Sequence, residues 1–341
     1  MRLLVIKMLL TATAFSGVLT SGVPADAEQV RGSGSTFVFP IMSKWAEDYA
    51  AQGGDKITYQ PIGSSGGIMQ IKSGMVDFGA SDMPLTGAEL DQAHLAQFPV
   101  VIGGVVAVVN ISGIKPGQLR FTGRLLADVF LGKVTNWSAP EIKALNPGVA
   151  LPDAGITVVH RSDGSGTTFN WVDYLSKVSP EWKTKVGAGA LVSWPTGIPA
   201  KGNEGVAEMV NRTKNCIGYV EYAYVFQNKM SYVAIQNRAG RFVEPGAAAF
   251  QAAAAGVEWQ SAKNFCSVIT DAPAEAAYPV AATTFILMHK SPTNLDREEA
   301  AFKFFRWALS RGQKQARSLA YVPLPDRLVE EIKVYWQLEI R

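Results

Sequence analysis

Residues 161–168, with the sequence RSDGSGTT, bring together an arginine, a carboxylate, four hydroxyl side chains and two glycines. Apolar residues precede this stretch as in a strand, and residues 169–175 have helical spacing. Free backbone N–H groups at the start of such a helix favour a small anion, and the guanidinium of Arg161 adds donors suited to a tetrahedral oxyanion. A simpler interpretation stays open, in which Asp163 and Ser165 only cap the helix.

Two earlier segments have a similar order of strand, small residues and helix. Residues 57–62 alternate like a strand and lead into GSSGG at 63–67, beyond which a short helix is expected from Ile68. A short strand at 28–31 leads into a flexible loop, and Thr36 then precedes a helix. Thr36 is therefore either an ordinary cap or a second donor for an anion.

Asp82 follows a predicted strand at residues 76–80. Pro84 ends that strand, and the pattern from Thr86 to Glu89 predicts a capping box at the start of the next helix. Open α/β sheets place ligand groups at the carboxyl ends of their strands. Asp82 is thus a candidate ligand group, although a solvated turn residue would have the same sequence signature.

The composition is that of a well-buried globular protein that does not bind nucleic acid. The chain has 341 residues, which predicts two domains, with 48% hydrophobic and 18% charged residues. The formal net charge is only +3, and there is no long run of basic residues. We therefore expect no nucleic-acid partner.

The first residues are typical of a secretory signal peptide. Arg2 and Lys7 precede an apolar run at residues 8–23, which ends near the small residues at 25–27. We expect cleavage near Ala27 and export of the remainder, without a lipid anchor because no cysteine follows the cleavage site. A membrane anchor is the alternative, but this run contains too many hydroxyl residues for a good span.

The alternation of strands and helices predicts an α/β fold with mainly parallel sheets. Residues 98–109 and 283–288 are long apolar runs typical of strands buried on both faces, and both are candidates for crossings between domains. Cys216 and Cys266 could pair in an oxidising compartment, or remain free thiols, because sequence alone does not place them within bonding distance.

Taken in order and spacing, these motifs resemble those of the periplasmic phosphate-binding proteins of bacterial phosphate ABC transporters. The resemblance covers nearly the whole chain after the signal peptide. It is carried by GSGSTF at 32–37, IGSSGG at 62–67, VDFGASD at 76–82, RSDGSGT at 161–167, IGYVEYAY at 217–224 and TTFIL at 283–287.

The resemblance implies a two-lobed α/β fold of the type II periplasmic binding protein class, with the ligand in the cleft between the lobes. A signal peptide would occupy residues 1–27, the first lobe residues 28–104 and 280–341, and the second lobe residues 105–279. It also implies a monomer that carries inorganic phosphate to the membrane permease of the transporter and its ATPase. The implied phosphate contacts are Thr36, the backbone N–H of Phe37, Ser64, Asp82, Arg161, Ser165, Gly166 and Thr167, with Asp163 orienting Arg161.

Asp82 would let this set of residues choose phosphate over sulfate. An ionised carboxylate can only accept a hydrogen bond, so it needs a proton on the ligand. Phosphate carries one at neutral pH and sulfate does not. Leaving a buried charge unpaired costs about 2 to 5 kcal/mol, which predicts at least tens-fold discrimination. Arsenate is also protonated and should be hard to reject.

Three other functions compete with this one. The sequence GSSGG formally fits the nucleophile pattern G-x-S-x-G, so a secreted serine hydrolase or phosphatase-like enzyme is conceivable, with Ser65 as nucleophile. The chain offers only three histidines and no His/Cys cluster with metal-ligand spacing, so we expect no enzyme, no metal site and no cofactor. A surface or adhesion protein that kept the fold is the remaining alternative.

Overall fold

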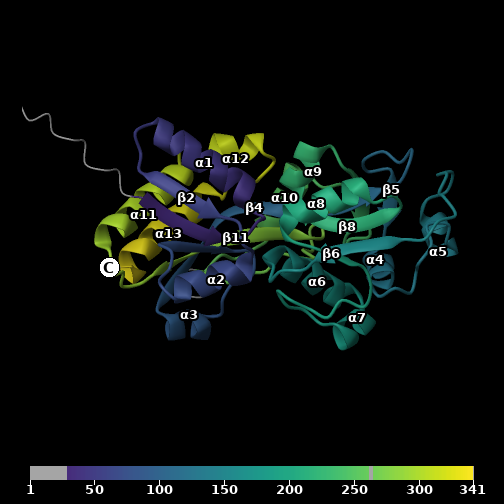
Figure 1. Ribbon diagram of the computed structural model, residues 1–341, viewed down its shortest axis with the longest axis horizontal. Coiled ribbons are helices and arrows are strands. Elements are labelled where there is room, and N and C mark those ends of the chain that lie inside the picture. Colours follow the sequence, from purple (N-terminus) through teal and green to yellow (C-terminus); the bar gives the residue numbers. More distant parts are fainter. Residues whose placement is uncertain (1–28, 261–263, 341) are drawn as a thin grey trace, which may run out of the picture.

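The computed structural model describes residues 29–260 and 264–340 as a mixed α/β molecule with two lobes (Figure 1). The strands form one continuous sheet with the order β2-β1-β3-β11-β4-β8-β6-β7. The predicted signal peptide lies outside the described residues. Among the residues described, no helix is long and apolar enough to cross a membrane.

The first lobe is built on three parallel strands, each followed by a helix. Strand β1 pairs in parallel with both β2 and β3, so the carboxyl ends of these strands point the same way. Residues that follow the strands are thereby gathered at one edge of the sheet. The elements are β1 (Gln29–Gly34), α1 (Phe39–Ala51), β2 (Lys56–Gln60), α2 (Ser64–Lys72), β3 (Phe78–Ser81) and α3 (Gly87–Ala93).

Two antiparallel strands run through the middle of the molecule. They are β4 (Leu95–Asn110) and β11 (Ala281–His289), which pair with each other over most of the length of β11. Strand β4 changes partner along its length, because its first part pairs with β11 up to Gly104 and its last part pairs with β8 from Val105. All but the last residue of each strand is buried, which explains why both are continuous apolar runs.

The second lobe extends the sheet beyond β4. Strand β8 is antiparallel to β4 but parallel to β6, and β6 is parallel to β7. Helix α6 begins directly after β6 and again brings small and hydroxylated residues to a strand end. The elements are β5 (Leu119–Phe121), α4 (Gly123–Phe130), α5 (Pro140–Leu145), β6 (Thr157–Arg161), α6 (Gly166–Val178), α7 (Pro180–Lys185), β7 (Ile198–Ala200), α8 (Gly202–Arg212), β8 (Cys216–Glu221), α9 (Tyr222–Asn228), β9 (Ser231–Gln236), β10 (Phe242–Val243) and α10 (Ala247–Ala255).

The last helices return to the first lobe after β11 (Figure 1). They are α11 (Leu295–Ala308), α12 (Gln313–Ser318) and α13 (Asp326–Glu339). Phe305 of α11 packs edge-on against Phe78 and Phe98, with ring centroids 4.9 and 5.7 Å apart. These aromatic contacts remove large apolar areas from water and fix α11 on the sheet of the first lobe.

Several predictions about the elements need correction. The sheet is not mainly parallel, because both central strands pair antiparallel with their neighbours and only the outer pairs are parallel. Residues 32–34 belong to β1 and are not a flexible loop, and the GSSGG segment forms the first turn of α2 from Ser64 onward. For the cysteines the sequence left two alternatives open, and in the structure Cys216 and Cys266 are both free thiols, one buried and one exposed.

Candidate functional site

The predicted ligand segments of the two lobes meet directly. The hydroxyl of Ser64, the first residue of α2, accepts hydrogen bonds from the backbone N–H of Gly166 at 3.0 Å and of Asp82 at 3.2 Å. Gly166 belongs to the second lobe, so Ser64 joins the lobes. Two accepted bonds occupy both lone pairs of the oxygen, so the proton of Ser64 is left for an acceptor, and the nearby carboxylate of Asp82 is one.

Asp82 is almost completely buried and receives only hydroxyl donors from side chains. Ser35 lies 2.7 Å from both carboxylate oxygens, and Thr284 of β11 donates to Oδ1 at 2.7 Å. Burial raises the pKa of Asp82 to about 6, although these bonds and the charge of Arg161 act in the opposite direction. The carboxyl group of Asp82 therefore accepts hydrogen bonds when ionised, and its pKa lies close to the pH range in which phosphate loses a proton.

Neither Ser35 nor Thr284 was among the predicted site residues. Ser35 stands beside the predicted Thr36 in the GSGSTF motif, and its role could have been found from that neighbourhood. Thr284 lies 202 positions from Asp82 along the chain, and only the pairing of β11 with β3 brings it near. Sequence reasoning assigned its strand to a crossing and gave its hydroxyl no role.

Arg161 ends β6 and forms a bidentate ion pair with Asp163. Arg161 Nε donates to Asp163 Oδ1 at 2.8 Å and Nη2 donates to Oδ2 at 2.5 Å, as expected for an arginine and a carboxylate. The backbone N–H of Gly202 also donates to Asp163, at 2.9 Å. Arg161 Nη1 is buried with no hydrogen-bond partner in the described structure. A buried guanidinium nitrogen without an acceptor is costly unless an anion completes it.

The start of α6 is capped as the simpler sequence interpretation expected. Ser165 Oγ accepts from the backbone N–H of Thr168 at 3.0 Å, and the N–H of Ser165 donates to the carbonyl of Ala190. Capping and anion binding do not exclude one another here, because the hydroxyl proton of Ser165 remains free. The side chain of Thr167 is buried beside it.

Asn203 connects two of the predicted ligand residues and was itself not predicted. Its side-chain nitrogen donates to Thr36 Oγ1 at 2.8 Å and to Thr167 Oγ1 at 3.0 Å, and its backbone N–H also donates to Thr36. Asn203 is fully buried, and its carbonyl oxygen accepts from the N–H of Glu221. Because Thr36 and Thr167 accept from Asn203, their own protons are left to be donated elsewhere.

Phe37 presents its backbone N–H to its own loop in this structure. That N–H donates to Ser35 Oγ at 2.9 Å, while the Ser35 hydroxyl contacts Asp82. The predicted role of Phe37 as a backbone donor to phosphate therefore requires an exchange of partners when a ligand enters. The aromatic ring is buried in the core beside β4.

Glycine is required where the two lobes touch. A Cβ atom on Gly166 would lie 2.5 Å from Ser64 Oγ and 2.7 Å from both Cβ and N of Asp82. On the opposite lobe, a Cβ atom on Gly63 would lie 2.5 Å from Asp163 Oδ2. Gly63 also has a φ of 90°, which other residues rarely adopt. The glycines of both motifs thus permit the close approach of the lobes.

Comparison with known proteins places the chain in a family. Residues 19–311 match the model of the PBP superfamily domain. The phosphate-binding protein PstS of Xylella fastidiosa strain 9a5c is 55% identical over 94% of this chain and 90% of its own length. The chain belongs to the PstS phosphate-binding protein family. The PstS protein of Pasteurella multocida is 48% identical over 98% of this chain and 96% of its own length.

The fold of this family member also matches solved structures. A crystal structure described as the ancestral soluble variant of the human phosphate-binding protein superposes with a TM-score of 0.74. It is 19% identical in sequence, and the match covers 90% of this chain and 93% of that one. At this identity the match shows the two-lobed fold alone.

The hydrolase alternative finds little support in this PstS family member. Ser65 is exposed on α2, and no hydrogen bond in the described part of the chain joins it to a histidine. His160 instead stacks on Trp194, with ring centroids 4.8 Å apart, and burial lowers its pKa. Within residues 29–260 and 264–340, no group of three or more His, Cys, Asp or Glu side chains is arranged to hold a metal ion.

Proposed function

We propose that this chain binds inorganic phosphate between its two lobes. The observation that carries the proposal is the combination of many donors with one acceptor. The hydroxyl protons of Thr36 and Thr167 are left free by their other bonds, and the same centre contains a buried, unpaired nitrogen of Arg161. Asp82 supplies the single carboxylate among them. A tetrahedral anion that still carries a proton satisfies both kinds of group.

The proposed contacts are those that the motifs indicate. Thr36, Phe37, Ser64 and Asp82 act from the first lobe, made of residues 28–104 and 280–341. Arg161, Ser165, Gly166 and Thr167 act from the second lobe, made of residues 105–279, and Asp163 orients Arg161. The change of partner by β4 between Gly104 and Val105 supports this division.

Calorimetric titration tests the binding. Protein freed of bound ions should release heat with phosphate at micromolar concentration and also with arsenate, because both carry a proton for Asp82. Sulfate should bind at least tens-fold more weakly, since it leaves the carboxylate facing an unprotonated oxyanion. Absence of phosphate binding, or equal binding of sulfate, contradicts the proposal.

We further propose that the protein is exported, acts in the periplasm as a monomer and delivers phosphate to the permease of an ABC transporter. The similarity to the PstS phosphate-binding proteins and the predicted signal peptide at residues 1–27 support this role. Deleting the gene should abolish high-affinity phosphate uptake, and a copy encoding Arg161→Ala should fail to restore it. Normal uptake after deletion would instead favour a surface or adhesion role.

A further inference from the structure

Glu221 is a carboxyl group buried where the two lobes join. It ends β8 and caps α9, and its side chain is completely excluded from solvent. A Cβ atom on Gly103 of β4 would lie 3.1 Å from Glu221 Oε1 and 2.9 Å from the ring of Phe37. The missing side chain at Gly103 therefore makes room for the carboxyl group beside residues 35–38, which join β1 to α1 and are called the anion loop below.

The hydrogen bonds around Glu221 contain one proton too few if the carboxyl group is ionised. The hydroxyl oxygen of Tyr321 lies 2.6 Å from the carbonyl oxygen of Phe37 and 3.1 Å from Glu221 Oε2. A carbonyl oxygen and a carboxylate oxygen can only accept, and the hydroxyl has a single proton. The shorter contact identifies Phe37 as the acceptor, so the contact with Glu221 has a proton only if Glu221 provides it.

We propose that Glu221 is a neutral carboxylic acid that donates to Tyr321, which in turn donates to the carbonyl of Phe37 and positions the anion loop. In this chain of bonds Oε2 carries the proton and still accepts from the N–H of Ala223 at 2.7 Å. Oε1 is then a carbonyl oxygen, and it has no partner in the described part of the chain. Glu221 and Tyr321 are thus positioning residues and do not touch the ligand.

The electrostatic surroundings agree with a neutral acid. Burial raises the pKa of Glu221 well above its ordinary value, and the negative charge of Asp82 acts in the same direction. The N–H of Ala223, at the start of α9, and the hydroxyl of Tyr321 act in the opposite direction. The part of β4 around Gly103 presents only apolar residues to Glu221. In the described residues, no ion pair joins Glu221 to a basic side chain. Tyr222 and Tyr224 of α9 also face this region, and burial raises the pKa of both.

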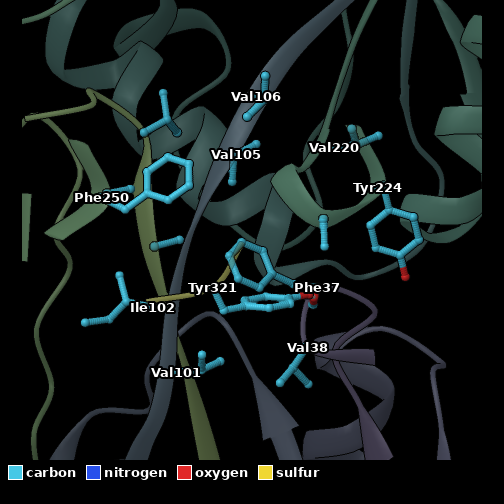
Figure 2. Packing of buried hydrophobic residues seen from close by; sticks show 14 of the residues in the cluster. Phe37, Val38, Val101, Ile102, Val105, Val106, Val220, Tyr224, Phe250 and Tyr321 are labelled. Atoms are coloured by element: carbon cyan, nitrogen blue, oxygen red, sulfur yellow. The ribbon is translucent and has the colours of Figure 1, made fainter. Parts of the chain in front are cut away.

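Hydrogen bonds from two tyrosines hold the peptide groups next to the backbone N–H that would bind phosphate. Tyr224 donates to the carbonyl of Thr36 at 2.8 Å, and that carbonyl shares its peptide plane with the N–H of Phe37. Tyr321 holds the next carbonyl along the chain, and its ring lies 6.3 Å from that of Phe37 (Figure 2). Hydrogen bonds in series polarise one another, so Tyr224 strengthens the Phe37 N–H as a donor, while Tyr321 fixes the orientation of the following peptide group. This last step rests on the proposed binding of phosphate.

Infrared spectroscopy of the ligand-free protein tests the state of Glu221. At about pH 9, ordinary carboxyl groups and those with a pKa near 7 are ionised, so few acids keep their proton. We expect a carboxylic acid C=O band that shifts when glutamate is labelled with ¹³C, disappears in Glu221→Gln and survives in the control Glu298→Gln. In Tyr321→Phe the band should move in frequency, because its hydrogen bond is lost.

The opposite infrared results overturn the proposal. A parent spectrum without a glutamic acid band, or a band that persists in Glu221→Gln, means that Glu221 is ionised. If Glu221→Gln fails to fold, the Tyr321→Phe spectrum decides: an unshifted band, or none, counts against the proposal.

Backbone amide exchange and phosphate titration test the positioning role. Tyr321→Phe should speed exchange at residues 36–39 and weaken phosphate binding about tenfold, the equivalent of one neutral hydrogen bond. The matched control is Tyr335→Phe, which removes a hydroxyl bonded to Gln97 and Asn264, away from residues 36–39, and should change neither quantity. Unchanged exchange in Tyr321→Phe overturns the positioning role. If the parent binds no phosphate, the proposed function fails, while the infrared and exchange results still decide the inference.

Discussion

At the scale of single residues, the centre is organised by which groups can donate and which can only accept. Asn203 supplies both protons of its amide to Thr36 and Thr167, and those hydroxyls must then donate in another direction. Asp82 imposes the reverse requirement, because it accepts from Ser35 and Thr284 and offers no proton. The identity of each side chain therefore matters more than its size.

Replacing Asp82 by asparagine should change selectivity more than phosphate affinity. The amide can donate to an unprotonated oxyanion, so sulfate should compete at least ten times better with Asp82→Asn than with the parent. Competition titrations with both anions measure the effect. Equal competition by sulfate in parent and variant contradicts the role of Asp82.

The same residue predicts how stability depends on pH. Because burial raises the pKa of Asp82 from 3.8 to about 6, the folded protein holds this proton more tightly than the unfolded chain. The proton on Asp82 therefore adds about 3 kcal/mol to the free energy of unfolding below pH 3.8, and this contribution is lost as the pH rises through 6. Ligand-free Asp82→Asn should therefore be more stable than the parent at pH 8, and the difference should shrink toward pH 4.

Thermal unfolding from pH 4 to 8 measures this difference. Glu141→Gln is a suitable control, because Glu141 is exposed on α5 and its substitution should leave the pH profile unchanged. A constant difference between Asp82→Asn and the parent at all pH values would show that Asp82 does not titrate in this range.

Replacing Asn203 by aspartate should weaken phosphate binding by about a hundredfold or more. The carboxylate would accept from Thr36 and Thr167 instead of donating to them, so both hydroxyl protons would turn away from the ligand, a loss of about two charge-assisted hydrogen bonds. The control is Asn146→Asp, since Asn146 is also buried in the second lobe but its side chain bonds to Arg120 and Ile142, away from the predicted ligand residues. Unchanged phosphate affinity in Asn203→Asp would rule out this orienting role.

At the scale of elements, strand ends and helix starts create the centre. Helices α2 and α6 begin with Ser64 and Gly166, and these two residues are hydrogen-bonded across the lobes. Such starts leave backbone N–H groups without partners inside the helix, so they are suited to meet at an anion. The helices can approach this closely only because one of the two residues in contact has no side chain.

Replacing Gly166 by alanine should keep the lobes apart. The added methyl group would fall 2.5 Å from Ser64 Oγ and 2.7 Å from the backbone of Asp82, and backbone atoms cannot move aside easily. We expect phosphate affinity to fall at least a hundredfold, with only a small change in stability of the ligand-free protein. Gly256→Ala is the control, because a Cβ atom there meets nothing within 4 Å. Similar affinities for both variants would contradict the importance of this contact.

At the scale of the whole molecule, hydrogen bonds join the two lobes directly. Asn170 of α6 donates to the carbonyl of Asp82 at 2.7 Å, and the N–H of Ser65 donates to the carbonyl of Gly164 at 3.1 Å. Strands β4 and β11 pass between the lobes and can serve as a hinge. A ligand shifts the balance between open and closed states only by the extra contacts it makes in the closed one.

Solution scattering should detect this shift. Phosphate should reduce the radius of gyration of the parent, whereas Gly166→Ala should stay expanded at the same phosphate concentration. Identical radii for the parent with and without phosphate would exclude closure as the response to binding.

Much of this organisation was predictable from the sequence because local chemistry decides it. The strand before Arg161, the helix after Thr167 and the capping box from Thr86 to Glu89 depend on near neighbours along the chain. The six motifs and their spacing were sufficient to indicate the family. Glycines at 63 and 166 were visible as part of motifs, although their steric reason was not.

The tertiary structure alone decided which distant groups complete the centre. Thr284, Asn203 and Tyr321 carry no local signal, since a buried threonine, an asparagine at a helix start and a core tyrosine are common in any protein. Their roles arise from contacts between residues 100 to more than 280 positions apart. The antiparallel pairing of the crossing strands is likewise a property of how the chain returns, because an apolar run shows that a strand is buried and not the direction of its neighbour.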